Sequence, residues 1–299
     1  MTALHTLLAP TDLSALARHA ALRAAMIATE TGARLCLQHV VNINALDSLR
    51  HLLDKEADEI ERRLLDSVRD DVEALAADIA ARTGIPPEVR LSSGPILTEI
   101  AAHADAIDAS LVVMGARGAG FLREMLIGST TERVLRKTRH PLLVVKQSPH
   151  EPYRRVLVPV DFSERSAEAI RIAQGVAPSA EILLLHAFDV PFEGKLRYAG
   201  VEDAQLSSLR VNAKREAVEQ LNALINAGGF PTDRIRRLVL HGDASTCILE
   251  EEQQQDCDLI VMGKRGRGAL EEMLLGSVSK HILLQSSADV LITDRASGG

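Results

Sequence analysis

The segment that decides the fold lies near the start of the chain and occurs twice. Residues 7–14 read Leu7-Leu8-Ala9-Pro10-Thr11-Asp12-Leu13-Ser14, and residues 156–163 read Val156-Leu157-Val158-Pro159-Val160-Asp161-Phe162-Ser163. Each copy is a short apolar run followed by an aspartate and a serine, which is typical of a buried strand that turns into a helix. The repetition indicates that one structural unit is written twice along the chain.

Other landmarks recur in the same order and at nearly the same spacing. The run Leu111-Val112-Val113-Met114-Gly115 returns as Leu259-Ile260-Val261-Met262-Gly263, and Gly94 returns as Gly242. The copies are offset by 149 residues at Asp12 and Asp161 and by 148 residues at the second run. Between them, residues 147–152 contain two prolines and no apolar periodicity, which marks a linker. We therefore predict two domains, residues 1–148 and residues 153–295.

Short leucine-rich and β-branched runs alternate with longer segments of helical period in each half, which indicates βαβ units around a parallel sheet. Strands are expected near residues 6–9, 34–40, 88–91, 111–114 and 142–146, and again near 155–158, 181–187, 236–240, 259–262 and 290–293. The first helix is expected to stop at Gly32. Long helices are expected near 52–82 and 203–227, the former as a solvated outer helix. The predicted fold class is α/β, with two tandem doubly wound domains.

Composition excludes several classes of protein. The 34 Lys and Arg against 41 Asp and Glu leave a formal charge of −7, and only 2% of the 299 residues are aromatic, which argues against a nucleic-acid partner. Every apolar run is far shorter than the roughly 20 residues that cross a bilayer, so no membrane role is expected. The start of the chain lacks the pattern of a signal peptide, so we expect a cytoplasmic protein. Three cysteines without a CxxC pair are expected to be free, buried packing residues, and no metal site is predicted.

A glycine pattern follows the fourth strand of each half. Gly115, Gly118 and the pair Gly128-Ser129 in the first copy match Gly263, Gly266 and the pair Gly276-Ser277 in the second. Glycines at the carboxyl end of a strand let the backbone approach an oxyanion, and a glycine and serine before a helix direct free N–H groups and the helix dipole toward a phosphate. Because ligands of open parallel sheets bind where the strand order reverses, we expect the first and fourth strands to be neighbours.

Three simpler interpretations stay open beside this one. Ser129 with Glu132 three residues later is also a capping box, which fixes a helix start without any ligand. Asp12 and Asp161 are alternatively plain N-caps. His39 and His186 end apolar strands and are expected to be structural histidines with satisfied hydrogen bonds rather than ligands.

With these residues in view, both halves resemble the universal stress protein family, and the whole chain resembles its tandem, ATP-binding members. The resemblance implies a five-stranded parallel sheet in the order 3-2-1-4-5 with helices on both faces. It also implies that the aspartates lie by the adenosine, that Val41 meets the adenine, and that the glycines and serine hold ribose and phosphates. The predicted nucleotide-binding residues are Pro10, Asp12, Val41, Met114, Gly115, Arg117, Gly118, Gly128, Ser129 and Thr130 in the first half, and Pro159, Asp161, Met262, Gly263, Arg265, Gly266, Gly276 and Ser277 in the second.

The second copy departs from the first near the glycines and the last strand. Val278 replaces the hydroxyl of Thr130, Lys280 stands where the first copy has Glu132, and Asp289 stands where it has Pro141. Lys264 and Arg267 add positive charge that is expected to compensate in phosphate binding.

The sequence favours binding over catalysis, because it lacks a GxxxxGK[ST] loop, a serine nucleophile elbow and an HExxH helix. The leading hypothesis is a cytoplasmic regulatory protein of the stress response that binds ATP, alone or with Mg²⁺, and acts on an unidentified protein partner. The alternatives are a nucleotide-independent interaction or chaperone-like protein, and a weak ATPase. The resemblance further implies that the fifth strands of the two halves pair as a pseudo-dimer within the chain, with a homodimer of two chains left open.

Overall fold

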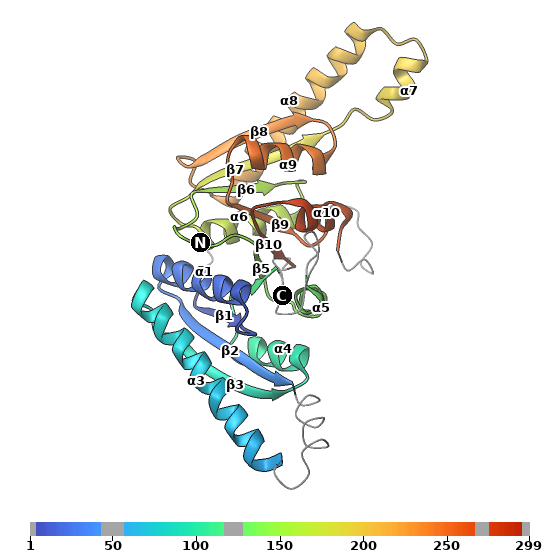
Figure 1. Ribbon diagram of the computed structural model, residues 1–299. Coiled ribbons are helices and arrows are strands. Elements are labelled where there is room, and N and C mark those ends of the chain that lie inside the picture. Colours follow the sequence, from blue (N-terminus) through green and yellow to red (C-terminus); the bar gives the residue numbers. More distant parts are fainter. Residues whose placement is uncertain (1–3, 43–56, 117–127, 267–274, 295–299) are drawn as a thin grey trace. The chain divides into compact units, whose positions relative to one another are not determined.

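The computed structural model describes residues 4–42, 57–116, 128–266 and 275–294 (Figure 1). The chain separates into two compact units, an N-terminal unit up to Pro152 and a C-terminal unit that begins at Tyr153. Each unit is a doubly wound α/β domain, which confirms the predicted fold class.

The N-terminal unit is built on a parallel sheet whose order is β3-β2-β1-β4-β5. Its strands are β1 (Thr6–Pro10), β2 (Arg34–Asn42), β3 (Glu88–Gly94), β4 (Leu111–Gly115) and β5 (Leu142–Val145). β1 pairs with β4 through Leu7 opposite Leu111 and Leu8 opposite Val112, so the first and fourth strands are neighbours, as expected. All residues of β1, β4 and β5 are buried, which explains why these strands read as continuous apolar runs.

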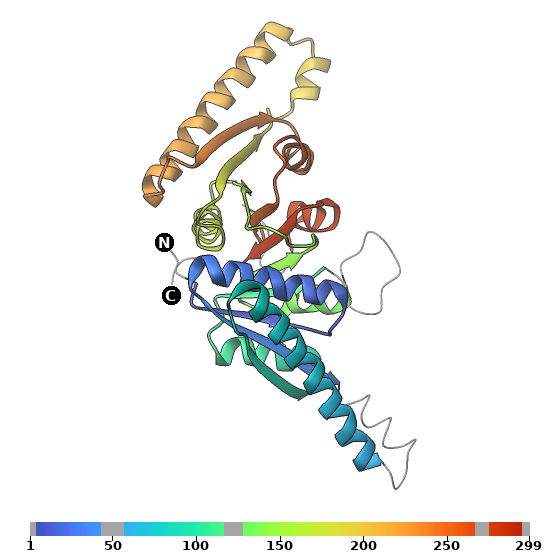
Figure 2. The same ribbon diagram turned by 60° about the vertical axis from the view of Figure 1, so that its left-hand side comes forward.

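Four described helices cover this sheet, with α1 and α3 side by side on one face and α4 and α5 on the other (Figure 2). They are α1 (Ala15–Thr31), α3 (Ala57–Thr83), α4 (Ile96–Ala106) and α5 (Ser129–Lys137). Ser14 caps α1 by accepting a hydrogen bond from the N–H of Ala17, and Gly32 ends it in the left-handed region at φ 71°, as predicted. The buried face of α1 is rich in alanine, which lets the helix lie close to the sheet. α3 is largely exposed along its first half and buries an apolar stripe, from Val72 to Ile79, along its second.

The C-terminal unit repeats this architecture in the order β10-β9-β6-β7-β8. Its strands are β6 (Arg155–Pro159), β7 (Glu181–Phe188), β8 (Ile235–His241), β9 (Leu259–Gly263) and β10 (Asp289–Thr293). Its helices are α6 (Glu164–Val176), α7 (Glu193–Tyr198), α8 (Asp203–Gly228), α9 (Ala244–Gln254) and α10 (Ser277–Gln285). α6 and α8 cover one face of the sheet, and α9 and α10 cover the other (Figure 2). Each described unit thus has the predicted five strands in the predicted order.

The C-terminal unit also explains the departure at Asp289. This carboxylate is fully buried at the start of β10, and its Oδ2 accepts a hydrogen bond of 2.6 Å from the hydroxyl of the buried Tyr153. Pro141 stands at the equivalent place in the N-terminal unit, where no such partner is required. A polar pair therefore replaces a rigid residue at the same point of the fold.

Candidate functional site

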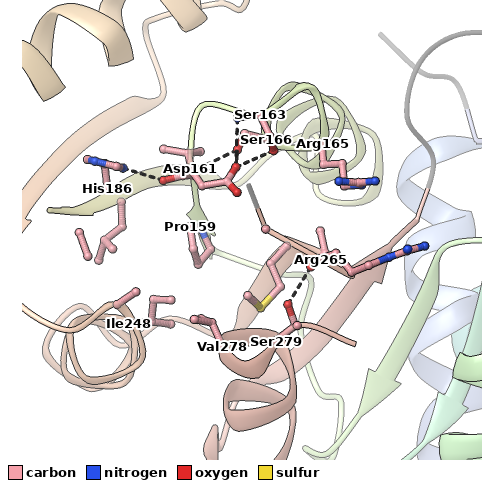
Figure 3. Close-up of a pocket in the computed structure, with 18 of the residues that line it drawn as sticks. Pro159, Asp161, Ser163, Arg165, Ser166, His186, Ile248, Arg265, Val278 and Ser279 are labelled. Carbon is pink, nitrogen blue, oxygen red and sulfur yellow. Dashed lines mark hydrogen bonds between the residues drawn. The ribbon is translucent and has the colours of Figure 1, made fainter. Parts of the chain in front are cut away.

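A pocket of about 410 Å³ opens at the carboxyl ends of β6, β7 and β9 in the C-terminal unit (Figure 3). β6 lies between β7 and β9, so the chain leaves this strand toward one side of the sheet and later returns on the other. In open parallel sheets the crevice at such a reversal of strand order is the usual place for a ligand. The pocket volume is within the range of about 300–1,000 Å³ that small-molecule sites occupy.

The eight residues predicted from the sequence of this half are brought together around that pocket. Its lining includes Pro159, Asp161, Met262, Gly263, Arg265, Gly266, Gly276 and Ser277. They come from the end of β6, the end of β9 and the start of α10, three places far apart in the sequence.

The predicted residues of the N-terminal unit occupy the equivalent places of its own sheet. Pro10 ends β1, Met114 and Gly115 end β4, and Val41 lies next to the end of β2. Gly128 is the N-cap of α5, and Ser129 and Thr130 are its first two residues. Asp12 is exposed between β1 and α1. Arg117 and Gly118 lie outside the described residues.

Asp12 and Asp161 are not the N-caps of the helices that follow them. The N-caps are Ser14 and Ser163, and each aspartate accepts, at 3.1 Å, the backbone N–H of the serine two residues later. The residue between aspartate and serine is left-handed in both copies, with φ 64° at Leu13 and 62° at Phe162. A left-handed conformation at a leucine or phenylalanine is uncommon and indicates a turn that the surrounding structure holds in place. The N-cap interpretation of the aspartates is therefore wrong.

The two aspartates differ in the hydroxyls that surround them. Oδ1 of Asp161 accepts hydrogen bonds from the hydroxyls of Ser163 at 2.6 Å and Ser166 at 2.7 Å, while the Ser166 hydroxyl accepts the N–H of Asp161 at 2.9 Å (Figure 3). The N-terminal unit has Ala17 at the position of Ser166. Ser166 was not predicted from the sequence, although the repeat shows a serine in place of an alanine five residues after the aspartate.

The glycine-serine pairs start their helices without a side-chain cap. The N-caps are Gly128 and Gly276, with ψ of 144° and 154°, and neither helix start has a side-chain cap hydrogen bond. Glu132 is bonded at 2.5 Å to Arg136, one turn later, instead of reaching back to the helix start. The capping-box interpretation of Ser129 and Glu132 is therefore wrong, because a capping box needs the serine as the N-cap.

Each of these helix starts is instead tied to the strand that precedes it. The N–H of Gly128 bonds to the carbonyl of Ala116 at 2.7 Å, and the N–H of Gly276 bonds to that of Lys264 at 2.9 Å. The hydroxyls of Thr131 and Ser279 donate, both at 2.9 Å, to the carbonyls of Gly115 and Gly263.

Thr131 and Ser279 were not predicted as site residues. Their signal is a hydroxyl residue three positions after the last glycine in both copies.

The strand-end histidines make the structural hydrogen bonds that were expected. Nδ1 of His39 lies 2.9 Å from the carbonyl of Thr11, and Nδ1 of His186 lies 2.8 Å from that of Val160. A carbonyl only accepts, so Nδ1 carries the proton in both. His186 also lines the pocket, and the centroid of its ring lies 4.2 Å from that of Phe162. It is therefore both a structural residue and part of the pocket wall.

One expected source of positive charge is directed elsewhere. Lys264 is buried, and its Nζ lies 3.0 Å from Oδ2 of Asp294, the residue that follows β10. The guanidinium of Arg265 reaches the other oxygen of Asp294 at 3.4 Å. The expectation that Lys264 supplies charge to a phosphate is wrong, because its ammonium is already paired. Arg267 lies outside the described residues.

The cysteines are free and buried, as the sequence analysis expected, and none of them lines the pocket. Burial raises the pKa of the Cys36 thiol to about 11 and that of Cys257 to about 12.

The fold and the site together define a tandem pair of doubly wound α/β domains with glycine-serine helix starts at the carboxyl edge of each sheet. The model of the universal stress protein family matches residues 4–146 and 152–294. The chain therefore belongs to the universal stress protein family and contains its domain twice.

Relatives with curated names agree with this assignment. A universal stress protein of Methanocaldococcus jannaschii is 30% identical over 146 residues, covering 48% of this chain and 83% of that protein. One of Mycolicibacterium smegmatis is 30% identical over 193 residues, covering 62% of this chain and 61% of that protein. The match thus spans about three fifths of the mycobacterial relative.

A solved structure extends the likeness to the full length. The universal stress protein from Archaeoglobus fulgidus is similar with a TM-score of 0.64 and 25% identity, covering 97% of this chain and 98% of that one. In the part of this chain that the structure describes, no helix combines the length and apolarity that a membrane crossing requires.

Proposed function

We propose that both halves of this universal stress protein bind an adenine nucleotide, ATP alone or with Mg²⁺, at the carboxyl edge of their sheets. Occupancy then regulates how the protein engages a partner in the cytoplasmic stress response. The observation that supports this most directly is the pocket of about 410 Å³ that gathers all eight residues predicted for the C-terminal half.

The two ends of this pocket suit the two ends of a nucleotide. Figure 3 places His186 and Ile248 at one end and Arg165 and Arg265 at the other. The first end is lined by apolar groups, with Leu185, Ala187 and Ile248 forming a surface suited to a purine. Gly263 lies against the stem of Arg165 and Gly276 against Arg265, so the glycines and Ser277, which follows Gly276, belong to the second end, where the backbone suits an anion.

The start of α10 offers the chemistry that a phosphate requires. The first backbone N–H groups of a helix have no partner within the helix. The Ser279 hydroxyl donates to the carbonyl of Gly263, and the N-cap, Gly276, has no side chain to offer. An oxyanion at this place would accept the N–H groups of the first turn and gain from the helix dipole.

The arrangement supports binding better than hydrolysis. Among the described residues that line the pocket, Asp161 is the one carboxylate. Its Oδ1 already accepts two hydroxyls and one backbone N–H, which hold it as a fixed acceptor rather than as a base poised beside a water. We therefore place regulation by occupancy ahead of turnover.

Proline at the first helical position gives a direct test. Ser277→Pro removes one N–H from the pocket edge, yet proline is favoured at this position, and the φ of −65° and ψ of 154° at Gly276 suit a residue before proline. We expect Ser277→Pro together with Ser129→Pro to lower ATP affinity at least tenfold without loss of folding, because a charge-assisted hydrogen bond contributes about 1.5–3 kcal/mol. Calorimetric titration with ATP and the thermal shift that ATP produces measure this.

Two controls separate the effect of losing the backbone N–H of Ser277 from the effects of losing its side chain and of introducing a proline. Ser277→Ala keeps the backbone N–H and should retain most of the affinity. Asp203→Pro makes the same change at the start of α8, where Glu202 has φ −64° and ψ 146°, and it should leave binding unchanged. Mass spectrometry of the freshly purified protein identifies the nucleotide that it holds. An absence of any adenine nucleotide from that spectrum, with no thermal shift in millimolar ATP, would favour a nucleotide-independent interaction protein.

A further inference from the structure

Arg165 is a pocket residue that neither the glycine pattern nor the repeat points to. It is the second residue of α6, it is partly exposed, and it lines the pocket. Its Nε is shielded from solvent and has no hydrogen-bond partner. Among the described residues, no carboxylate lies within ion-pair distance of its guanidinium. A cationic group that lines a cavity without an anion beside it is available to pair with an anionic ligand there.

The other charged groups near Arg165 already have partners. Lys264 and Arg265 both reach Asp294, and Oδ1 of Asp161 is held by the hydroxyls of Ser163 and Ser166. Within the described pocket wall, Arg165 is therefore the cation whose charge no carboxylate compensates.

The stem of Arg165 fixes which end of the pocket the charge reaches. A Cβ placed on Gly263 would lie 3.2 Å from Cβ of Arg165 and 3.7 Å from its Cδ, so the arginine stem crosses the glycine that ends β9. Figure 3 shows Arg165 and Arg265 at the same end of the pocket, away from His186 and Ile248. Arg165 thus stands at the glycine end, where the proposed function puts the phosphates.

The equivalent position of the N-terminal half carries no charge. Leu16 is the second residue of α1, and it follows the N-cap Ser14 as Arg165 follows the N-cap Ser163. The two sites therefore share the turn, the helix start and the glycines, but differ by one positive charge at this position.

We propose that Arg165 is a specificity-determining residue that binds the phosphate chain in the C-terminal pocket, so that this half discriminates among nucleotides by their number of phosphates more strongly than the N-terminal half does. The inference rests on the proposed function, because it assumes that an adenine nucleotide occupies the pocket. Arginine suits this task, since its planar guanidinium donates two parallel hydrogen bonds to phosphate oxygens.

Photolabelling of the full chain tests each half separately. The probes are 8-azido-ATP, 8-azido-AMP and 8-azidoadenosine, and mass spectrometry of the labelled peptides assigns each label to one half. We expect Arg165→Leu to weaken 8-azido-ATP labelling of the C-terminal half about ten- to a hundredfold, which is the range for a lost charge-assisted hydrogen bond. Labelling by 8-azidoadenosine should change less than about twofold, because adenosine has no phosphate for the guanidinium to bind.

Three further variants sharpen the test. Arg165→Lys should fall between the native protein and Arg165→Leu, since it keeps the charge but loses the paired donors. Leu16→Arg should strengthen ATP labelling of the N-terminal half relative to adenosine. Arg171→Leu removes the same charge from the same helix, at a residue that pairs with Glu168 and does not line the pocket. It should leave the ratio of ATP labelling to adenosine labelling unchanged in both halves.

The outcomes distinguish this inference from the proposed function. If neither half shows labelling that excess unlabelled ATP suppresses, both the nucleotide site and the role of Arg165 are overturned. If the C-terminal half is labelled, but Arg165→Leu weakens ATP and adenosine equally or leaves both unchanged, the nucleotide site stands and the role of Arg165 is overturned. A loss confined to the phosphorylated probes supports the inference.

Discussion

Cys36 illustrates how burial controls the chemistry of a single residue. Its side chain is 5% exposed, and its Sγ lies 3.2 Å from Nε2 of His103 on α4, another buried residue. Burial is the largest cause that raises the pKa of this thiol to about 11, and the nearby Glu88 carboxylate raises it further. A buried thiol with so high a pKa is a packing residue rather than a nucleophile.

The native thiols are therefore expected to resist alkylation. At pH 8, only about one Cys36 thiol in a thousand is ionised, since each unit between pH and pKa is a factor of ten, and Cys257 has a still higher pKa of about 12. Iodoacetamide should leave both residues unmodified in the native protein and modify both in urea, with peptide mass spectrometry as the readout. Rapid labelling of Cys36 in the native protein would show that this part of the core opens readily.

Residues that act through their backbone or at a chain turn were the predictable ones. Glycine, proline and aspartate at fixed spacing after a strand indicate tight turns at the carboxyl edge of the sheet, because few other residue types adopt the backbone conformations of such turns. Ser166, Ser279 and Arg165 were not predictable in the same way. Their roles depend on which strand end each helix start meets, and this is known only when the helices are packed on the sheet.

At the scale of elements, the short helix α7 is the part of the C-terminal unit that was not predicted. Six residues give too little periodicity to recognise a helix, and its N-cap, Phe192, is left-handed at φ 61° without a glycine to signal it. α7 is held by Glu193, whose carboxylate contacts Arg210 of α8 and, at 2.9 Å, Nε2 of His241 at the end of β8. Arg197 of α7 and Asp189 after β7 also face this cluster. Three elements thus meet at one carboxylate.

This cluster predicts an acid-sensitive α7. The hydrogen bond from Arg210 is the largest cause that lowers the pKa of Glu193 below its ordinary value of 4.5. A carboxyl group with a lowered pKa contributes stability above the unfolded pKa and loses it as the pH falls through the folded pKa. We expect α7 to detach as the pH falls through the lowered pKa of Glu193, because the carboxylate then gains its proton and loses its charge toward Arg210. Hydrogen exchange of peptides from residues 193–198, compared between pH 7 and pH 3 after correction for the intrinsic rate, measures this.

Substitution of Glu193 tests whether its carboxylate causes the acid sensitivity of α7. Glu193→Gln should raise exchange in α7 at pH 7 to nearly the acid level and flatten its pH dependence. Glu219→Gln, on the exposed side of α8, should do neither. A Glu193→Gln protein with the same pH dependence as the native protein would assign the acid response to another group.

At the scale of the whole molecule, the duplication is what made the fold predictable. Three landmarks in register define two copies, and the strands and turns predicted in one copy can be checked against those of the other. The two copies are not identical, and the structure shows where their differences lie. Ser166 replaces Ala17 and Arg165 replaces Leu16 at the carboxyl edge, while buried Asp289 replaces Pro141 at the other end of the sheet, so the same fold carries different side chains in its two copies. The pairing of residues 142–146 with 290–293 stays a prediction.

Two nucleotide sites on one chain predict a definite number of ATP molecules bound per chain. If each half binds one nucleotide, titration of the native protein with ATP should reach two molecules per chain. Ser129→Pro and Ser277→Pro should each weaken a different one of the two sites at least tenfold, so the titration should separate into one tight and one weak site. The double variant should have two weak sites and no tight one. Because Arg165 is present in one half alone, the site left in Ser277→Pro should lose less affinity from ATP to AMP than the site left in Ser129→Pro. Two residual sites with identical preferences would mean that the differences between the copies do not reach the ligand.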